Sequence, residues 1–430
     1  MSIEIVEVVG RRVWDSRGRP TVEAEVRLAG GAAGRAIAPA GASTGSAEAL
    51  DKRDGGTAFG GLDVTQAVAA VNGEIADLLR GRDANDQAGA DRALIARDGT
   101  PNKSRLGGNA LVATSMAVAQ AAAAAAGQPL WQSLGAGPES ARLPLPEIQI
   151  FGGGAHAGRR VDVQDFMVIA VGARSYSQAL DWTAEVYRAA GRIMSEAGLL
   201  QGVADEGGYW PAFGSNEEAL DALLRAIEGA GFTPGGDVAI SLDIAATDFG
   251  QGGRYSLAAD GRSVDSDGLS EMLLGWLERY PIVAIEDPLA EDDAEAMARF
   301  TAAAGPAVEV VADDFICTRA DRVAAAVGAG ACNTALIKPN QAGTLTEARA
   351  ALEAARAAGW EAIVSARSGE SEDVTIVHLA VGWGVKQLKV GSFARSERMA
   401  KWNEGLRIAE ALGQDGGRLP SRAGLPWGRR

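Results

Sequence analysis

The sequence is poor in cysteine and histidine, and each scarcity excludes a class of protein. Only Cys317 and Cys332 occur among 430 residues, too few for the disulfide framework of a small secreted domain. The two histidines leave no imidazole series, which disfavours a zinc site. The chain also has no apolar run long enough to span a bilayer, and its charged start lacks a signal-peptide core. We therefore expect a cytoplasmic protein that does not enter a membrane.

Basic residues are fewer than acidic residues. There are 41 lysines and arginines against 56 aspartates and glutamates, which gives a net charge of −15. A nucleic acid or an anionic membrane surface is therefore not an expected partner. A small anionic substrate would need a local cluster of cations or a metal ion to overcome this field.

Charged residues stand at the ends of short apolar segments in the second half of the chain. Four such segments end on Asp243, Glu286, Asp313 and Lys338. Each segment is typical of a strand that is buried on both faces of a parallel sheet. The last three ends are 27 and 25 residues apart, about the length of one strand, one helix and two loops. This rhythm continues through Arg367 and Lys389 and predicts an α/β fold with a (β/α) barrel, whose active site lies at the carboxyl ends of the strands.

A plainer explanation exists for each of these residues taken alone. An aspartate after a strand is more often a helix N-cap than a ligand, and a single lysine is more often solvated. Independent capping would not place a charge at the end of strand after strand. The repetition therefore favours a functional site.

The first third of the chain has a different pattern. Alternating strands are expected at 3–9, 21–28 and 35–40, and helices at 63–79, 85–96 and 109–126. We predict an α+β N-terminal capping domain over residues 1–140 and a barrel domain over 141–430, with the boundary near a proline-rich stretch at 143–147.

Several loops have a composition that suits mobility. Residues 39–46 are small and polar, as in an ordinary connection or in a lid that closes over a ligand. The glycine-rich stretch 151–160 lacks the strand, helix and acidic residue of a dinucleotide-binding loop. The segment 161–169 reads as a strand with Asp165 near its middle, and a helix is expected over 175–198. Residues 248–267 replace a helix and form a third candidate mobile loop.

The predicted strand ends bring hard oxygen ligands and cations together. Three carboxylates without a thiol select Mg²⁺ or a similar cation. Such a cation would disfavour the charged form of a nearby lysine, and the neutral lysine could then serve as a base. Such a set suits abstraction of a proton next to a carboxylate, and Arg367 with Ser368 suits a phosphate oxygen.

Motifs along nearly the whole chain resemble one family. They are DSRGRPTVEAEV (15–26), GASTGS (41–46), DEGGY (205–209), LDIAATDF (242–249), IEDPLAEDD (285–293), ADDF (312–315), IKPNQAGTLTEA (337–348), RSGESED (367–373) and KVGSFARSERMAKWN (389–403). In combination they resemble the enolase (phosphopyruvate hydratase) family. The resemblance implies an irregular ββαα(βα)6 barrel behind a small α+β domain, and a homodimer or higher homo-oligomer. It also implies Mg²⁺-dependent interconversion of 2-phosphoglycerate and phosphoenolpyruvate.

The resemblance also implies roles for single residues. The metal ligands would be Asp243, Glu286 and Asp313, with one structural Mg²⁺ and a second ion that arrives with substrate. The catalytic residues would be the base Lys338, the acid Glu206, and Lys389, Asp165 and His156. The substrate contacts would be Arg367, Ser368, Asp314 and the first-loop residue Ser43, which would also meet the second metal.

The chain departs from the family pattern in places that matter. Ala366 stands where the family has an active-site histidine, and Asp165 where it has a glutamate. In the loops, Ala40 replaces a usual serine, and Arg159 and Arg160 are additions. We interpret these changes as an altered dehydration half of the site, with space left by the missing imidazole and an intact proton-abstracting half.

Four functions remain open on this sequence. The first is a specialised paralogue acting on a phosphorylated or phosphonate three-carbon acid. The others are a housekeeping enolase, an enzyme like carboxyphosphonoenolpyruvate synthase of phosphonate biosynthesis, in which Arg159 and Arg160 would hold an extra anionic group, and a non-catalytic binding protein with this fold. A non-catalytic protein would be expected to have lost the lysines and the metal-ligand carboxylates, and this sequence retains them.

Overall fold

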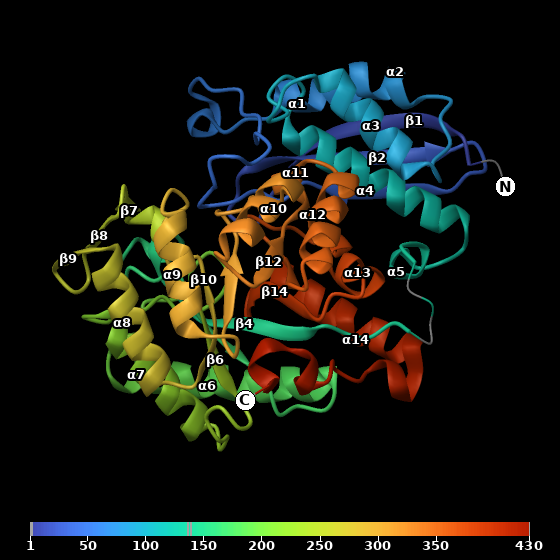
Figure 1. Ribbon diagram of the computed structural model, residues 1–430. Helices are drawn as coiled ribbons and strands as arrows, with labels where there is room; N and C mark the ends of the chain where they lie inside the picture. The colour runs from blue at the N-terminus through green and yellow to red at the C-terminus, as the bar shows by residue number, and fades with distance from the viewer. Residues whose placement is uncertain (1–2, 136, 138–139, 430) are drawn as a thin grey trace.

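A computed structural model describes residues 3–135, 137 and 140–429. Within them the chain forms two lobes (Figure 1). The upper lobe, drawn from blue to teal, holds the elements from β1 to α4, and the lower lobe holds a barrel. Among the described residues no helix is long and apolar enough to cross a membrane. Cys317 and Cys332 are both buried and unpaired as thiols.

The upper lobe is an antiparallel sheet backed by helices. The strand order is β1-β2-β3, and α4 packs against β2 and β3. Small residues make this close approach possible. The helix α4 is rich in alanine and almost wholly buried, and a Cβ added at Gly34 of β3 would overlap the backbone of Ala117 and Ala121. The strands are β1 (Ile5–Trp14), β2 (Pro20–Leu28) and β3 (Ala33–Ile37). The helices are α1 (Thr65–Ala70), α2 (Ala76–Leu79), α3 (Gln87–Asp98), α4 (Gly108–Ala125) and α5 (Leu130–Ser133).

The helix expected over 63–79 is interrupted. A π-helical turn at Val71–Ile75 separates α1 from α2. Asn72 in this turn accepts a hydrogen bond from the backbone amide of Gly10 and returns one to its carbonyl. This tertiary contact with β1 gives a reason for a local deviation that helical periodicity does not encode.

The lower lobe is a closed barrel in the order β10-β11-β12-β13-β14-β4-β5-β6. Its strands are β4 (Leu145–Gly152), β5 (Asp165–Ile169), β6 (Ala239–Asp243), β10 (Ile282–Glu286), β11 (Glu309–Ala312), β12 (Thr334–Ile337), β13 (Glu361–Ser365) and β14 (Gln387–Ser392). The helices are α6 (Tyr176–Glu196), α7 (Asn216–Gly229), α8 (Ser266–Arg279), α9 (Ala294–Ala304), α10 (Ala320–Ala329), α11 (Pro339–Ala342), α12 (Leu345–Ala357), α13 (Thr375–Gly382) and α14 (Ser396–Gly416). The order β4-β5-α6-α7 followed by six βα units confirms the expected ββαα(βα)6 barrel.

Two sequence expectations were wrong in this lobe. The segment 248–267, expected as a mobile loop, contains a small antiparallel sheet of β7 (Gly250–Gln251), β8 (Arg254–Leu257) and β9 (Arg262–Asp265). The Tyr255 hydroxyl ties this sheet to the barrel by bonding Asp293 and the amide of Ala290. Asp165 is the first residue of β5 and not near its middle.

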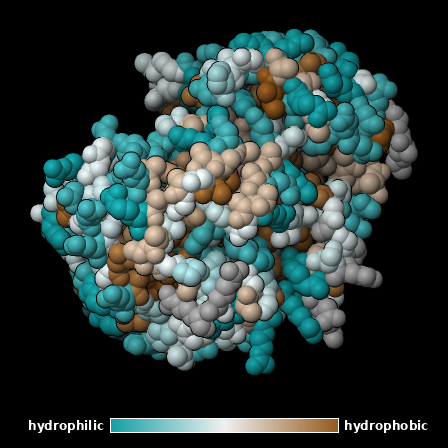
Figure 2. All heavy atoms as spheres, viewed as in Figure 1, coloured by the Kyte–Doolittle hydropathy of each residue, from teal (hydrophilic) through white to brown (hydrophobic). Residues whose placement is uncertain are grey.

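The core is continuous through both lobes, and a smaller apolar cluster that includes Leu145, Leu425 and Trp427 packs against the amino ends of barrel strands. On the face shown in Figure 2, polar residues cover most of the surface. A pale brown band crosses α10 and α12, whose sequences are rich in alanine.

Candidate active site

The charged residues expected at strand ends meet at one mouth of the barrel. Asp243 and Glu286 are the last residues of β6 and β10 and lie opposite one another in the ladder. Asp313 and Lys338 follow β11 and β12 directly. Parallel strands deliver their carboxyl ends to the same edge. The closed barrel therefore gathers residues that are up to 95 positions apart in sequence, from Asp243 to Lys338.

Asp165 reaches this mouth by a different route. β5 runs antiparallel to both β4 and β6, so its first residue lies beside their last ones. Asp165 is paired with Asp243 across the β5–β6 ladder. An antiparallel strand presents its amino end where its neighbours present their carboxyl ends. This is why a residue that starts a strand joins residues that finish one.

Two buried lysines lie among the carboxylates. Lys389 Nζ is 2.8 Å from Asp243 Oδ2 and 2.7 Å from Glu286 Oε2, and 3.6 Å from Asp165 Oδ2. Lys338 Nζ donates a short hydrogen bond to Asp313 Oδ2. Burial alone would lower the pKa of each lysine, but the surrounding carboxylates outweigh it and the pKa of both is raised. The neutral lysine base expected from the sequence thus depends on a cation that offsets these carboxylates.

The expected ligands of a divalent cation pass a test of chemical fit. Glu286 Oε1 is buried and has no hydrogen-bond partner among the described residues, so one oxygen remains to be satisfied. The donors are hard carboxylate oxygens, as Mg²⁺ prefers. As they stand, the oxygens of Asp287, Asp313 and Asp314 lie within 4.8 Å of one another, whereas the expected set of Asp243, Glu286 and Asp313 is not so close a group among the described residues. Asp287, however, already accepts the amides of residues 313 and 314, at 2.9 and 2.7 Å, and so braces the loop. We therefore favour Asp243, Glu286 and Asp313 as the ligand set, which stays a prediction.

The imidazole of His156 lies next to three other expected site residues. His156 Nδ1 is 3.0 Å from Asp165 Oδ1, and Nε2 is 2.8 Å from Ser368 Oγ and 3.8 Å from Glu206 Oε1. Burial would lower the pKa of His156, but Asp165 and Glu206 raise it to about 9. Burial would raise the pKa of Asp165, and the same imidazole lowers it well below its usual range. Gln149 of β4 also donates to Asp165. The pair is therefore a buried ion pair that holds the shorter carboxylate in place.

Arg367 is held by the segment that follows the first loop. Its Nη1 is 2.9 Å from Glu48 Oε2, and its Nη2 is 3.1 Å from Glu48 Oε1 and 3.0 Å from the carbonyl of Ser43. Burial would lower the pKa of Arg367, but Glu48 outweighs it and raises this pKa further. The first loop, 39–46, is also fixed by backbone pairing, because Ala40 exchanges hydrogen bonds of 2.9 and 2.8 Å with Gly369. The loop therefore lies closed over the barrel mouth.

The second loop, 152–160, is fixed from outside the cavity. Arg159 donates to the carbonyl of Asp248 at 3.0 Å and lies 3.7 Å from its carboxylate. Gly158 packs on the ring of Trp210, where an added Cβ would lie 3.0 Å from the ring. Arg159 thus holds the loop that carries His156.

A cavity of about 20 Å³ remains between these groups, which is room for about one water molecule. Ala366 lines it, so the space expected from the missing imidazole is largely closed. Nine of the expected site residues line this cavity: Ser43, His156, Asp165, Glu206, Asp243, Lys338, Arg367, Ser368 and Lys389. Glu286 and Asp313 do not line the cavity themselves, but they form ion pairs with Lys389 and Lys338, which do. Asp314 is buried in the loop after β11, behind Asp313, and its expected substrate contact stays a prediction.

Sequence reasoning missed the polar residues that brace the site. Gln164 donates to Asp243 at 3.1 Å, and Gln341 donates to Asp313 at 2.9 Å. Glu48 was also missed. An amide next to a catalytic carboxylate carries no periodic signal, although Gln149 inside the apolar strand 145–152 is a polar residue without an evident reason and could have been flagged.

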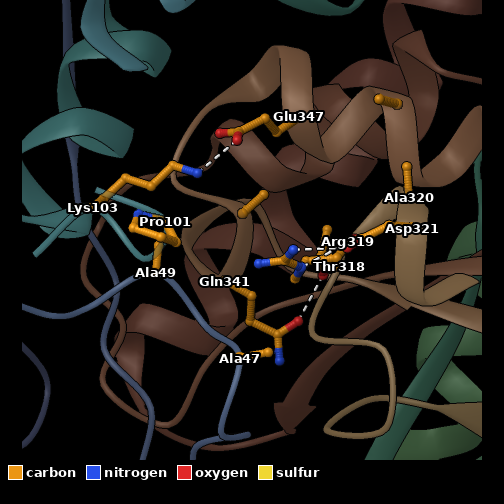
Figure 3. Close-up of a pocket in the computed structure, with 12 residues that line it drawn as sticks. Ala47, Ala49, Pro101, Lys103, Thr318, Arg319, Ala320, Asp321, Gln341 and Glu347 are labelled. Carbon is orange, nitrogen blue, oxygen red and sulfur yellow. Dashed lines mark hydrogen bonds and ion pairs between the residues drawn. The ribbon is translucent and has the colours of Figure 1, made fainter. Parts of the chain in front are cut away.

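A larger cavity of about 400 Å³ lies behind the first loop. Figure 3 shows Ala49 and Pro101 on one side of it and Thr318 with Ala320 on the other, with the ion pair of Lys103 and Glu347 above them and Ala47 below. Gln341 borders this cavity and also contacts Asp313 and Glu48. Gln341 therefore connects the lining of the larger cavity to Asp313 and Glu48.

Two protein-family models match the chain. The model described as the enolase N-terminal domain matches residues 5–134, and the one described as the enolase C-terminal TIM barrel domain matches residues 140–418. The two matches meet between the lobes and include every residue of the site described above.

Proposed function

Because the chain belongs to the enolase family, we propose that it is a Mg²⁺-dependent enzyme that removes the proton α to a carboxylate. The proposed substrate is 2-phosphoglycerate or a closely related phosphorylated or phosphonate three-carbon acid, and the product is of the enol-phosphate type. One observation carries this proposal: the buried side chains of Lys338, Lys389 and Arg367 converge on one cavity that is also bordered by carboxylates. Burying so many charged groups costs free energy of folding, and such clusters occur preferentially at functional sites.

The residues divide the work by position. Lys338 would accept the proton, and Lys389 would neutralise the substrate carboxylate as negative charge develops on it. Mg²⁺ held by Asp243, Glu286 and Asp313 would supply further positive charge for that carboxylate. Arg367 and Ser368 would hold the phosphoryl oxygens. Glu206, braced by the His156–Asp165 ion pair, would assist departure of the group on C3.

We further propose that the chain is a specialised paralogue, with housekeeping enolase as the alternative. Ala366 lines the cavity and has no group that could donate or accept a proton. The hypothesis of an extra anionic group, as in a carboxyphosphonoenolpyruvate synthase-like enzyme, loses part of its support because Arg159 is engaged with Asp248. The intact lysines and carboxylates speak for an enzyme and against a binding protein.

Exchange of the C2 proton with solvent tests the proposal. 2-Phosphoglycerate and Mg²⁺ in D₂O should lose the C2–H signal in an NMR time course, and Lys338→Ala should lower the exchange rate by about 10² to 10⁴-fold. Lys386→Ala is the matched control, since Lys386 pairs with Glu361 where β13 begins, at the other end of the barrel, and should exchange like the parent. Absence of exchange in the parent, or equal exchange in Lys338→Ala, would sink the proposal.

A further inference from the structure

The donors of Arg367 are nearly all in use. A guanidinium has five N–H groups, and four of them belong to Nη1 and Nη2. Nη1 contacts Glu48 and the side chain of Asn340 at 3.3 Å, while Nη2 contacts Glu48 and the Ser43 carbonyl. These four contacts match the four Nη hydrogens in number. An anion that needs the two-pronged face of Arg367 must therefore take it from another acceptor.

Glu48 is the acceptor that an anion would compete with. It is the only one of the three acceptors that carries a charge, and it holds both Nη atoms at once, the arrangement that phosphate and carboxylate ligands also adopt. Its Oε1 also accepts the amide of Gly45 at 3.0 Å and a bond from Gln341 at 3.3 Å. Glu48 thus joins Arg367 to the first loop and, through Gln341, to Asp313.

The segment that carries Glu48 has space behind it. Ala47 and Ala49 line the larger cavity, and both carry only a methyl side chain (Figure 3). Glu48 lies between them in sequence and contacts Arg367 on the other side. Glu48 itself borders a further cavity of about 380 Å³ beside the first loop, so its side chain has space to turn into when it leaves Arg367, although the amide of Ala49 stays bonded to the carbonyl of Gln341.

We propose that Glu48 is a specificity-determining residue, an internal counter-ion that an incoming anion must displace from Arg367. Exchanging one carboxylate for another singly charged group gains nothing, because the charge and the hydrogen bonds stay the same while Glu48 is left buried without its partner. A phosphoryl or phosphonyl dianion brings more charge and a third acceptor oxygen. Glu48 therefore selects the dianion. The proposal rests on the proposed function in one respect, the assignment of Arg367 as the phosphate contact.

Calorimetric titration with inorganic phosphate tests this proposal without turnover. Glu48→Gln keeps the shape of the side chain and removes its charge, and it should bind phosphate about tenfold more tightly than the parent, or better. Acetate should gain affinity by a larger factor than phosphate, so that the preference for phosphate over acetate falls, and equal gains for the two anions would show that Glu48 does not set the preference. Phosphate should also raise the melting temperature of Glu48→Gln more than that of the parent, which keeps the test usable if the variant is less stable.

Two controls separate competition from other effects. Glu291 also holds the first loop, through the amide and hydroxyl of Ser46, but does not contact Arg367 in the described structure. Glu291→Gln should therefore leave phosphate affinity within about twofold of the parent if loop loosening is not the cause. Arg367→Met should abolish the gain in the Glu48→Gln background. Weaker or unchanged phosphate binding in Glu48→Gln would overturn the proposal, since a residue that merely positions Arg367 gives that result. If Glu48→Gln binds phosphate more tightly as expected but the parent does not exchange the C2 proton, the result would count against the proposed reaction and not against the role of Glu48.

Discussion

Lys389 Nζ lies 2.7 Å from Glu286 Oε2 inside the barrel mouth, with both side chains buried. The other oxygen of Glu286 has no hydrogen-bond partner among the described residues. The lysine therefore compensates only part of the negative charge that the strand ends bring together. The remaining charge and the unsatisfied oxygen are what a divalent cation would bind.

Magnesium should stabilise the folded protein. A ligand that binds only the native state adds about 2.7 kcal/mol at one hundred times its Kd, so the melting temperature should rise with Mg²⁺ concentration and fall again with EDTA. Glu286→Gln should lose most of this rise. Glu361→Gln is the matched control, because Glu361 pairs with Lys386 away from the site, and it should keep the rise. A parent protein whose melting temperature ignores Mg²⁺ would contradict the ligand assignment.

The His156–Asp165 pair should make stability fall at alkaline pH. The pKa of His156 rises from 6.5 to about 9 on folding, so its contribution is complete below pH 6.5 and is lost as pH rises through about 9. The loss is on the order of 2 to 4 kcal/mol. Urea unfolding at several pH values should show this fall in the parent.

The variant His156→Gln should flatten that part of the profile. The control is His378→Gln, since His378 pairs with Glu404 between α13 and α14, outside the site, and this variant should retain the fall. Identical profiles for the parent and His156→Gln would show that the ion pair does not titrate as stated.

Restoring an imidazole at position 366 should cost stability. Ala366 borders a cavity with room for about one water molecule, so a histidine must push its neighbours apart. Overfilling of this kind costs about 1 to 3 kcal/mol, and Ala366→His should unfold at correspondingly lower urea concentration. Ala362→Val, a smaller enlargement in β13, the strand that ends just before Ala366, serves as comparison. A variant Ala366→His as stable as the parent would mean that the first loop yields easily.

Proton exchange and dehydration should proceed at different rates. If the acid half of the site is altered, C2 exchange of 2-phosphoglycerate should exceed formation of the enol phosphate by about 10² or more, the contribution of one acid or base group. Ultraviolet absorbance follows the product and NMR follows the exchange. Turnover on the order of 10 per second or more would instead identify a housekeeping enolase that tolerates Ala366 and Asp165.

The sequence was sufficient for the barrel and for most of its mouth. Charges that follow apolar segments at a constant interval predicted where Asp243, Glu286, Asp313 and Lys338 would meet, because parallel strands share one edge. The same reasoning failed for Asp165. Nothing in a five-residue apolar strand reveals its direction, and only the ladders with β4 and β6 fix β5 as antiparallel.

Loops and braces were harder to predict for a related reason. The glycine-rich segment 248–267 forms strands that are tied to the barrel by the hydrogen bonds of Tyr255. Glu48 was missed because its partner in the site, Arg367, is 319 positions away in sequence. Both depend on long-range contacts that local composition does not contain. The domain boundary near residue 140, the ligand set and the individual roles stay predictions.

The pairing of Ala40 with Gly369 determines when the first loop can close during protein synthesis. These two residues exchange backbone hydrogen bonds although 329 positions separate them. At the usual 5 to 20 residues per second, the ribosome needs roughly a quarter of a minute to a minute to travel that interval. Throughout this time the emerging upper lobe has a β1-β2-β3 sheet to fold but no partner for its first loop. In a nascent chain the first loop therefore has no backbone partner to close on until residue 369 has been made.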